Sequence, residues 1–145
     1  MAGRTESIIR NFVGALEKGD LDGALSFFTE DATWYTAPGT FKGKDEIKKY
    51  ATWLIQAVSN MKFTDDGVGI LVQGNKALYQ HILTGSFEGI AFKVPAVCTY
   101  EFDGEKCKNH WTINDRLLIA KQVATGPIAK KAVSMIINRT EKGLR

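Results

Sequence analysis

The second half of the chain consists of short runs rich in β-branched, aromatic and alternating apolar residues, separated by turn-forming pairs. The runs cover residues 68–72, 77–87, 91–102 and 106–113. The turns between them contain Gly74-Asn75, Glu88-Gly89 and Asp103-Gly104. Such runs predict strands, and glycine-containing pairs favour hairpin turns. This half therefore predicts an antiparallel meander, in which Pro95 marks a bulge or an edge because it cannot donate to a ladder.

The first half spaces its apolar residues three and four apart, which predicts helices. The first helix carries Ile8, Ile9, Phe12, Ala15 and Leu16 and ends near Gly19. Asp20 is placed to cap a second, short helix that carries Leu21, Ala24, Leu25 and Phe28. A strand is expected over residues 32–36. A third helix is expected from about Gly43, with one apolar face made of Ile47, Tyr50, Ala51, Leu54, Ala57 and Val58.

The chain after residue 114 predicts further helical structure. Residues 115–124 are expected to form a short helix or an irregular closing segment. Pro127 suits the first turn of another helix, so residues 127–142 are expected to be a C-terminal helical extension. Its apolar stripe contains Ile128, Ala132, Val133, Ile136 and Ile137. That stripe is expected to cover a pocket mouth, to pack across a dimer partner, or to dock on the sheet of its own chain.

Helices followed by a run of antiparallel strands predict the α+β class, with the helices on one face of the sheet. The 145 residues are the usual size of one domain, and no linker or repeat divides them. We therefore expect a single domain over residues 1–145. A meander curved by bulges would wrap around the helices and leave a cavity between them.

Charge and cysteine content narrow the classes of function. The net charge of +3 comes from basic and acidic residues spread along the chain, so no nucleic-acid partner is expected. Cys98 and Cys107 form no CxxC pair, which favours a reducing compartment. No apolar run approaches the roughly 20 residues of a membrane helix. A cytoplasmic protein without a membrane partner is expected.

Several motifs in the first 125 residues resemble the nuclear transport factor 2-like superfamily. These are Gly19-Asp20-Leu21-Asp22, Phe28-x-x-Asp31-Ala32-Thr33, Pro38, Gly43-x-x-x-Ile47 and Asp115-x-x-x-x-x-x-Gln122. Their order most resembles ketosteroid isomerase and the SnoaL-like polyketide cyclases. The resemblance implies a cystatin-like cone, a strongly curved mixed or antiparallel sheet around about three N-terminal helices. It does not imply one reaction, because this fold hosts isomerases, cyclases, hydrolases and binding modules.

The residues that ketosteroid isomerase needs are missing here. Where that family places a tyrosine donor, an aspartate base and an acid, this chain has Phe12, Thr36 and Cys98. Phe has no donor, Thr is a very weak base, and a buried thiol is a weak donor. Steroid isomerisation by that mechanism is not expected. The resemblance to SnoaL-like cyclases implies Asp115 as a catalytic acid.

Strand alternation together with the family alignment places both histidines of the chain, His81 and His110, on the cavity side. Imidazole exchanges protons near neutral pH, so these two residues and Asp115 are the catalytic candidates. The alternative is that one or both are hydrogen-bonded core residues. No metal is expected, because a catalytic zinc site usually needs three protein ligands and no motif supplies a third. No organic cofactor motif is present, so no cofactor is expected.

The remaining candidates are residues that would line the pocket. They are Phe12, Phe28, Trp34, Tyr50, Trp53, Tyr79, Cys98, Thr112 and Asn114. Core packing is the alternative role for most of the aromatic ones, although Trp34 and Tyr50 carry polar atoms that need partners when buried.

Two functions from different classes follow. The first is a cofactor-independent enzyme, an isomerase, cyclase or lyase acting by acid–base chemistry on a small apolar carbonyl or polyketide-like compound. The second is a non-catalytic module of the same fold that binds a ligand or dimerises. A homodimer through the outer sheet face is expected, with Cys107, Trp111 and Ile113 as its apolar patch.

Overall fold

The computed structural model describes residues 2–144, which form five helices and six strands. The helices are α1 (Ala2–Lys18), α2 (Leu21–Leu25), α3 (Gly43–Ala57), α4 (Arg116–Val123) and α5 (Gly126–Thr140). The strands are β1 (Phe28–Tyr35), β2 (Thr40–Lys42), β3 (Val58–Gln73), β4 (Lys76–Phe87), β5 (Ile90–Asp103) and β6 (Lys106–Asn114). The α+β class is confirmed.

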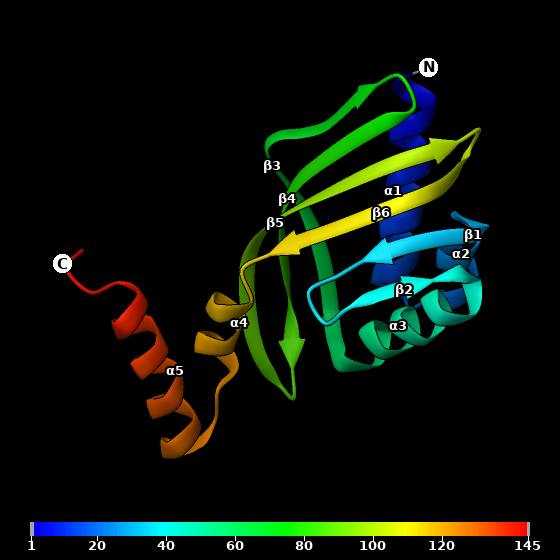
Figure 1. Ribbon diagram of the computed structural model, residues 1–145. Helices are drawn as coiled ribbons and strands as arrows, with labels where there is room; N and C mark the ends of the chain where they lie inside the picture. Colours follow the sequence, from blue (N-terminus) through cyan, green and yellow to red (C-terminus); the bar gives the residue numbers. More distant parts are fainter. Residues whose placement is uncertain (1, 145) are drawn as a thin grey trace.

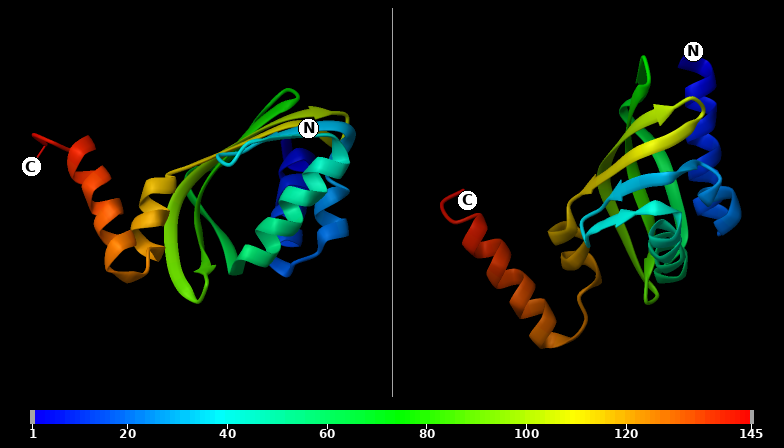
Figure 2. Two further views of the ribbon diagram at one scale, coloured as in Figure 1. Left: turned by 60° about the horizontal axis from the view of Figure 1, so that its bottom comes forward. Right: turned by 45° about the vertical axis from the view of Figure 1, so that its right-hand side comes forward.

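All six strands form one curved sheet in the order β2-β1-β6-β5-β4-β3. β1 runs parallel to β6, and the other neighbours are antiparallel. The sheet curves around α1, α2 and α3, which lie on its concave side (Figures 1 and 2). The expected cone is therefore present, with its interior between these helices and the inner sheet face.

The N-terminal part follows the helical pattern with two corrections. Helix α3 ends at Ala57, so Val58 does not belong to its apolar face but begins β3. Asp20 caps α2, and its carboxylate accepts a hydrogen bond from the amide of Gly23 at 2.9 Å. The sequence predicts that Phe28 belongs to this helix, but in the structure it is the first residue of β1. Helix α2 ends at Leu25 because the chain turns there to place Phe28 opposite Cys107 of β6.

Strand β3 begins ten residues earlier than the apolar run at 68–72 predicted. It pairs with β4 from Val58 onward, and its register shifts between Asp65 and Ile70. The extra residues bulge opposite Gln80, whose side chain accepts a hydrogen bond from the amide of Val68 at 3.2 Å. Gly67 has a φ of 53° in this bulge, and a Cβ there would collide with Gln80. The bulge bends the sheet, as bulges generally do.

Pro95 lies at an edge and not at a bulge. It pairs with Ile82 of β4 without a register shift, whereas the pairing of β5 with β6 begins only at Ala96. Helix α4 covers the free edge of β5 near this point. The side-chain amide of Gln122 accepts a hydrogen bond from the amide of Lys93 at 2.8 Å and donates one to its carbonyl at 2.9 Å. Gln122 thus replaces a strand neighbour that β6 does not supply.

The expectation that Cys107 lies on the outer sheet face is wrong. Cys107 pairs with Phe102, and Asn109 pairs with Glu101, so Lys108 is an extra residue in β6. This bulge changes the alternation, and Cys107 is fully buried in the core. Its thiol donates to the carbonyl of Asn109 at 3.2 Å.

Helix α5 projects from the body of the cone and packs against α4 (Figure 1). It does not dock on the sheet of its own chain, and none of its residues is buried. Ile128 is 85% exposed and Ile136 is 53% exposed, so much of the predicted apolar stripe has no partner within residues 2–144. Within the same residues, no helix combines the length and the hydropathy needed to cross a bilayer.

Candidate functional site

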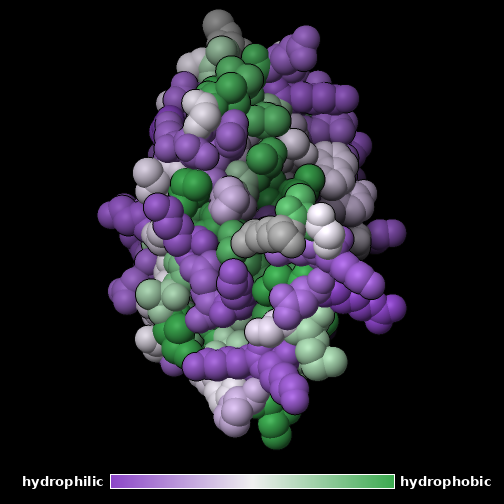
Figure 3. Space-filling model, turned by 90° about the vertical axis from the view of Figure 1, so that its left-hand side faces the viewer, coloured by the Kyte–Doolittle hydropathy of each residue, from purple (hydrophilic) through white to green (hydrophobic). Residues whose placement is uncertain are grey.

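Two adjoining hollows lie between the helices and the inner face of the sheet, and together they are called the funnel here. The outer hollow, of about 300 Å³, lies between α3, α4 and the sheet. It is lined by Ala37, Pro38, Tyr50, Trp53, Leu54, Val58, Leu83, Phe87, Phe92, Thr112, Asn114, Arg116, Ile119, Ala120 and Val123. Figure 3 views the molecule from the side of α5 and shows apolar side chains at the surface between hydrophilic ones.

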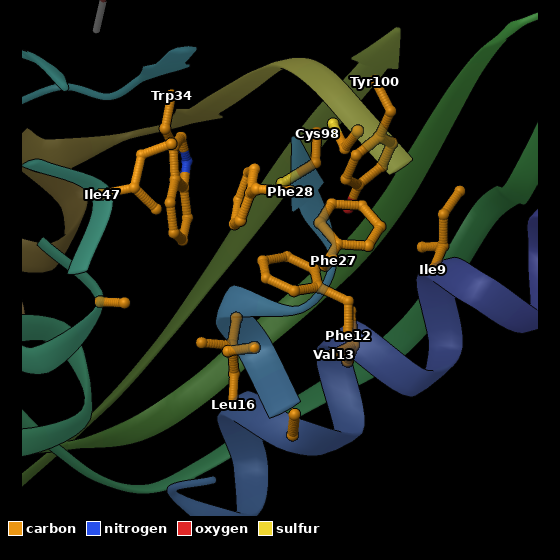
Figure 4. Packing of buried hydrophobic residues seen from close by; sticks show 14 of the residues in the cluster. Ile9, Phe12, Val13, Leu16, Phe27, Phe28, Trp34, Ile47, Cys98 and Tyr100 are labelled. Carbon is orange, nitrogen blue, oxygen red and sulfur yellow. The ribbon is translucent and has the colours of Figure 1, made fainter. Parts of the chain in front are cut away.

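The inner hollow holds about 50 Å³ and reaches the two histidines. It is lined by Phe12, Val13, Leu16, Trp34, Tyr50, Leu54, Met61, Phe63, His81, Leu83, Ala96, Cys98, Tyr100, His110, Thr112 and Asn114. Residues on both linings connect the hollows: Tyr50, Leu54, Leu83, Thr112 and Asn114. Most of the interior behind them is filled by aromatic packing (Figure 4), with the rings of Phe12 and Phe27 stacked at 4.1 Å.

His110 lies in a complete hydrogen-bond network. Its Nδ1 lies 3.2 Å from the carbonyl oxygen of Thr99, which can only accept, so Nδ1 carries the proton. Its Nε2 then accepts from the hydroxyl of Thr112 at 3.3 Å. Thr112 in turn accepts from Nε1 of Trp34 at 2.9 Å and from the thiol of Cys98 at 3.8 Å. Burial lowers the pKa of His110 to about 3, so the ring is neutral.

His81 is held differently. Its Nδ1 lies 3.1 Å from the carbonyl oxygen of Tyr79, so this nitrogen is again the protonated one. Its Nε2 is therefore an acceptor, and it makes no hydrogen bond with residues 2–144. The ring stacks on Tyr79 at 4.5 Å and lines the inner hollow. Burial lowers the pKa of His81, partly opposed by the bond to Tyr79 and by the charge of Asp65.

A profile of the SnoaL-like domain family matches residues 9–110, which is most of the chain. This chain belongs to the SnoaL-like domain family. The match begins at Ile9 within α1, includes α2, α3 and the first five strands, and ends at His110 within β6. The comparison with curated proteins found no match.

Solved structures with the same fold are numerous. A protein of Catenulispora acidiphila with a ketosteroid isomerase-like fold, solved with trimethylamine, is 17% identical; the alignment covers 82% of this chain and 93% of that one, with a TM-score of 0.74. A protein of unknown function from Burkholderia pseudomallei, which resembles nuclear transport factor 2, is 16% identical over 84% and 98% of the chains, with a TM-score of 0.75. TsrD from Streptomyces laurentii is 17% identical over 84% and 96%, with a TM-score of 0.73. At these identities the likeness establishes the fold of the SnoaL-like domain alone.

The structure brings most of the expected site residues together. Six of the expected lining residues reach the inner hollow of this SnoaL-like domain: Phe12, Trp34, Tyr50, Cys98, Thr112 and Asn114. Trp53 lines the outer hollow and is 49% exposed. Phe28 lines neither, because its ring packs against Phe12 and Trp34 in the core.

Tyr79 lies behind His81 and not on either lining. Its hydroxyl donates to Asp65 at 2.8 Å, and Arg10 contacts the same carboxylate at 2.8 and 3.1 Å. The hydrogen bond from Arg10 is the main reason why the pKa of Asp65 lies below its usual value. This ion pair is exposed and anchors β3 to α1 beside the strand that carries His81.

Asp115 is not with the histidines. It is exposed, lines neither hollow of the funnel, and caps α4 by accepting from the amide of Leu118 at 3.0 Å. The SnoaL-like motif that ends in Gln122 is thus accounted for by structure: Asp115 caps α4 and Gln122 attaches it to β5.

Helix α4 contributes a side of the outer hollow whose residues were not among those predicted from the sequence. Its lining residues are Arg116, Ile119, Ala120 and Val123. Their spacing of three and four is the signature of one helix face, and this signal could have found them. No group of three His, Cys, Asp or Glu residues able to hold a metal occurs within residues 2–144.

Proposed function

We propose that this SnoaL-like domain binds a small, largely apolar carbonyl or polyketide-like compound in the funnel and moves a proton at Nε2 of His81. The observation that carries this proposal is the state of the His81 ring. Its Nδ1–H is fixed on the carbonyl of Tyr79, which leaves Nε2 free as an acceptor on a ring that lines the inner hollow. A base must be within hydrogen-bond reach of the proton it takes, and the apolar lining supplies the closed surroundings.

The proposed reaction uses His81 alone as base and then as acid. The lowered pKa keeps the ring neutral at pH 7, so Nε2 can take a proton from the bound compound. The resulting imidazolium keeps its bond to the carbonyl of Tyr79 and is favoured by the charge of Asp65. It then returns the proton to a different atom of the compound, which gives an isomerisation or a ring closure without a cofactor. Such proton transfer contributes typically about 10²–10⁴-fold in rate.

In this proposal His110 is a positioning residue. Both of its nitrogens are engaged, and its network holds Trp34, Thr112 and Cys98 in place around the hollow. The high pKa of Cys98, about 11, has the same cause as the low pKa of His110, because burial disfavours both charged forms.

A non-catalytic binding module is the second candidate, and one observation favours it. Asp115, the acid implied by the family, lies outside the funnel, so it cannot serve as a second proton donor opposite His81. The same apolar pocket would then retain its ligand unchanged.

Deuterium incorporation separates these candidates. 1-Tetralone, a small apolar ketone, would be incubated with the protein in D₂O, and exchange at its α-carbon followed by NMR, with binding measured separately by native mass spectrometry. We expect exchange that is faster than the buffer rate and that returns to it in His81→Gln. Binding without exchange would leave the non-catalytic module. If neither 1-tetralone nor any other apolar compound is bound or exchanged, both candidates are contradicted.

We also infer self-association through the outer sheet face. Leu71 and Ile113 are 54% and 61% exposed there, and a hollow of about 640 Å³ lies over Leu71, Leu78 and Trp111. Contiguous apolar surface of this kind often marks an interface. Sedimentation is expected to give a dimer that Leu71→Lys dissociates, and a monomer at all concentrations would contradict it.

A further inference from the structure

The funnel of this SnoaL-like domain has a strongly asymmetric distribution of polar groups. Two residues on the lining of the inner hollow each carry a free hydrogen-bond acceptor. One is Nε2 of His81, and the other is Oδ1 of Asn114, a buried atom without a hydrogen-bond partner among the described residues. Leaving such an atom unpaired is costly, so a bound group that donates to it gains correspondingly.

Four donors around the inner hollow are already committed. Trp34 and Cys98 donate to Thr112, and Thr112 donates to His110. His110 donates to the carbonyl of Thr99. A ligand group that accepts from any of these four donors would therefore compete with an existing network, whereas one that donates would satisfy a free acceptor.

The outer end carries the opposite preference. The linings of the two hollows include one residue of the types Lys, Arg, Asp and Glu, and this residue is Arg116. None of the salt bridges within residues 2–144 includes it. A guanidinium suits a carboxylate because its N–H groups can bind both oxygens. No carboxylate on the lining would compensate the charge of a cationic ligand.

Resting on the proposed binding function, we propose that the ligand is an amphipathic acid: an apolar, ring-sized body with a neutral O–H or N–H donor that enters first toward His81 and Asn114, and a carboxylate that stays at Arg116. The inner hollow of about 50 Å³ has room for a small group of this kind, and the outer hollow of about 300 Å³ holds the body. This orientation also places the bound group beside Nε2 of His81, the atom to which the proposed function assigns proton transfer.

A matched set of aromatic probes tests the proposal. The set contains 3-(4-hydroxyphenyl)propanoate, its methoxy analogue without the donor, and tyramine, in which an ammonium replaces the carboxylate. The corresponding 6-hydroxy- and 6-methoxy-2-naphthoates repeat the comparison with a larger body, and 2-methoxynaphthalene reports apolar binding alone. Dissociation constants would come from NMR shifts of the Trp34 Nε1–H signal, which lies beside the inner hollow.

We expect at least one hydroxy acid to bind about tenfold more tightly than its methoxy analogue, the effect of one hydrogen bond to a buried partner. Asn114→Ala should reduce this ratio, and Arg116→Gln should remove the preference for the acid over tyramine. Lys121→Gln, an exposed cation on the same helix that lines neither hollow, is the control and should change neither.

Equal or tighter binding of the methoxy acids, or of tyramine, would overturn the proposal. If 2-methoxynaphthalene binds while every acid fails, the pocket stands but its assigned polarity is wrong. If no probe binds, including the apolar one, the proposed binding function falls as well.

Discussion

Nε2 of His110 lies 3.3 Å from the hydroxyl of Thr112, and this contact makes the two histidines of the chain chemically different. It predicts the effect of Thr112→Val, which keeps the shape but removes the hydroxyl. Trp34 and His110 would both lose a partner in the core, so we expect a loss of about 2 kcal/mol in the free energy of unfolding. Thr112→Ser keeps the hydroxyl and should cost less than half as much in urea unfolding. Equal losses would show that the hydroxyl is unimportant.

Stability is expected to fall on mild acidification. Burial holds the pKa of His110 at about 3 and lowers the pKa of His81, whereas a histidine in the unfolded chain has a pKa of about 6.5. Between these values the unfolded chain binds protons that the folded chain does not. Stability therefore falls as the pH drops below about 6.5, by about 1.4 kcal/mol per pH unit for each histidine that stays neutral.

Urea unfolding at pH 7 and pH 5 measures this effect. His110 alone should contribute about 2 kcal/mol over that interval. His110→Gln is expected to be less stable at pH 7 but to lose less on acidification. The pKa of Asp65 lies below this window, so its titration does not interfere. A His110 signal that titrates near pH 6.5 in NMR would contradict the burial argument.

The side chain of Gln122 is expected to keep the outer hollow in shape. It makes both hydrogen bonds of Lys93 at the free edge of β5, and α4 carries Arg116 and Val123 on the lining. Gln122→Ala should therefore speed hydrogen exchange of the Lys93 amide by at least about tenfold, the equivalent of one lost hydrogen bond. Lys121→Ala, on the exposed side of α4, is the control. Unchanged exchange in Gln122→Ala would mean that α4 is held by its other contacts.

Helix α5 is expected to contribute little to the stability of the cone. None of its residues is buried, and α4 is the one helix or strand with which it makes extensive contact within residues 2–144. Ending the chain after residue 125 should change the free energy of unfolding by less than about 1 kcal/mol, the range of surface changes. The same truncated protein in sedimentation shows whether the exposed stripe at Ile128 and Ile136 takes part in self-association. A large loss of stability in a monomer would show that α5 belongs to the folded unit.

Much of the fold and of the inner lining could be predicted from local pattern. Alternation along β4, β5 and β6, together with the family alignment, correctly placed His81, Cys98 and His110 on the buried side. The cap at Asp20 and the start of α3 at Gly43 were confirmed because each depends on residues within one helical turn. Where a bulge adds a residue, as at Lys108, the same pattern failed for Cys107.

By itself the sequence determined the class of the fold, the order of most of its helices and strands, and which residues of each regular strand share a face, because these depend on spacing along the chain. The short strand β2 was not predicted. Only the tertiary structure decided that His110 is bound at both nitrogens while His81 is free at one. Trp34 and Thr112 are 78 residues apart, and they meet because β1 lies parallel to β6. Tertiary structure also placed Asp115 outside the funnel and Arg116 at its mouth, since the chain turns into α4 between them.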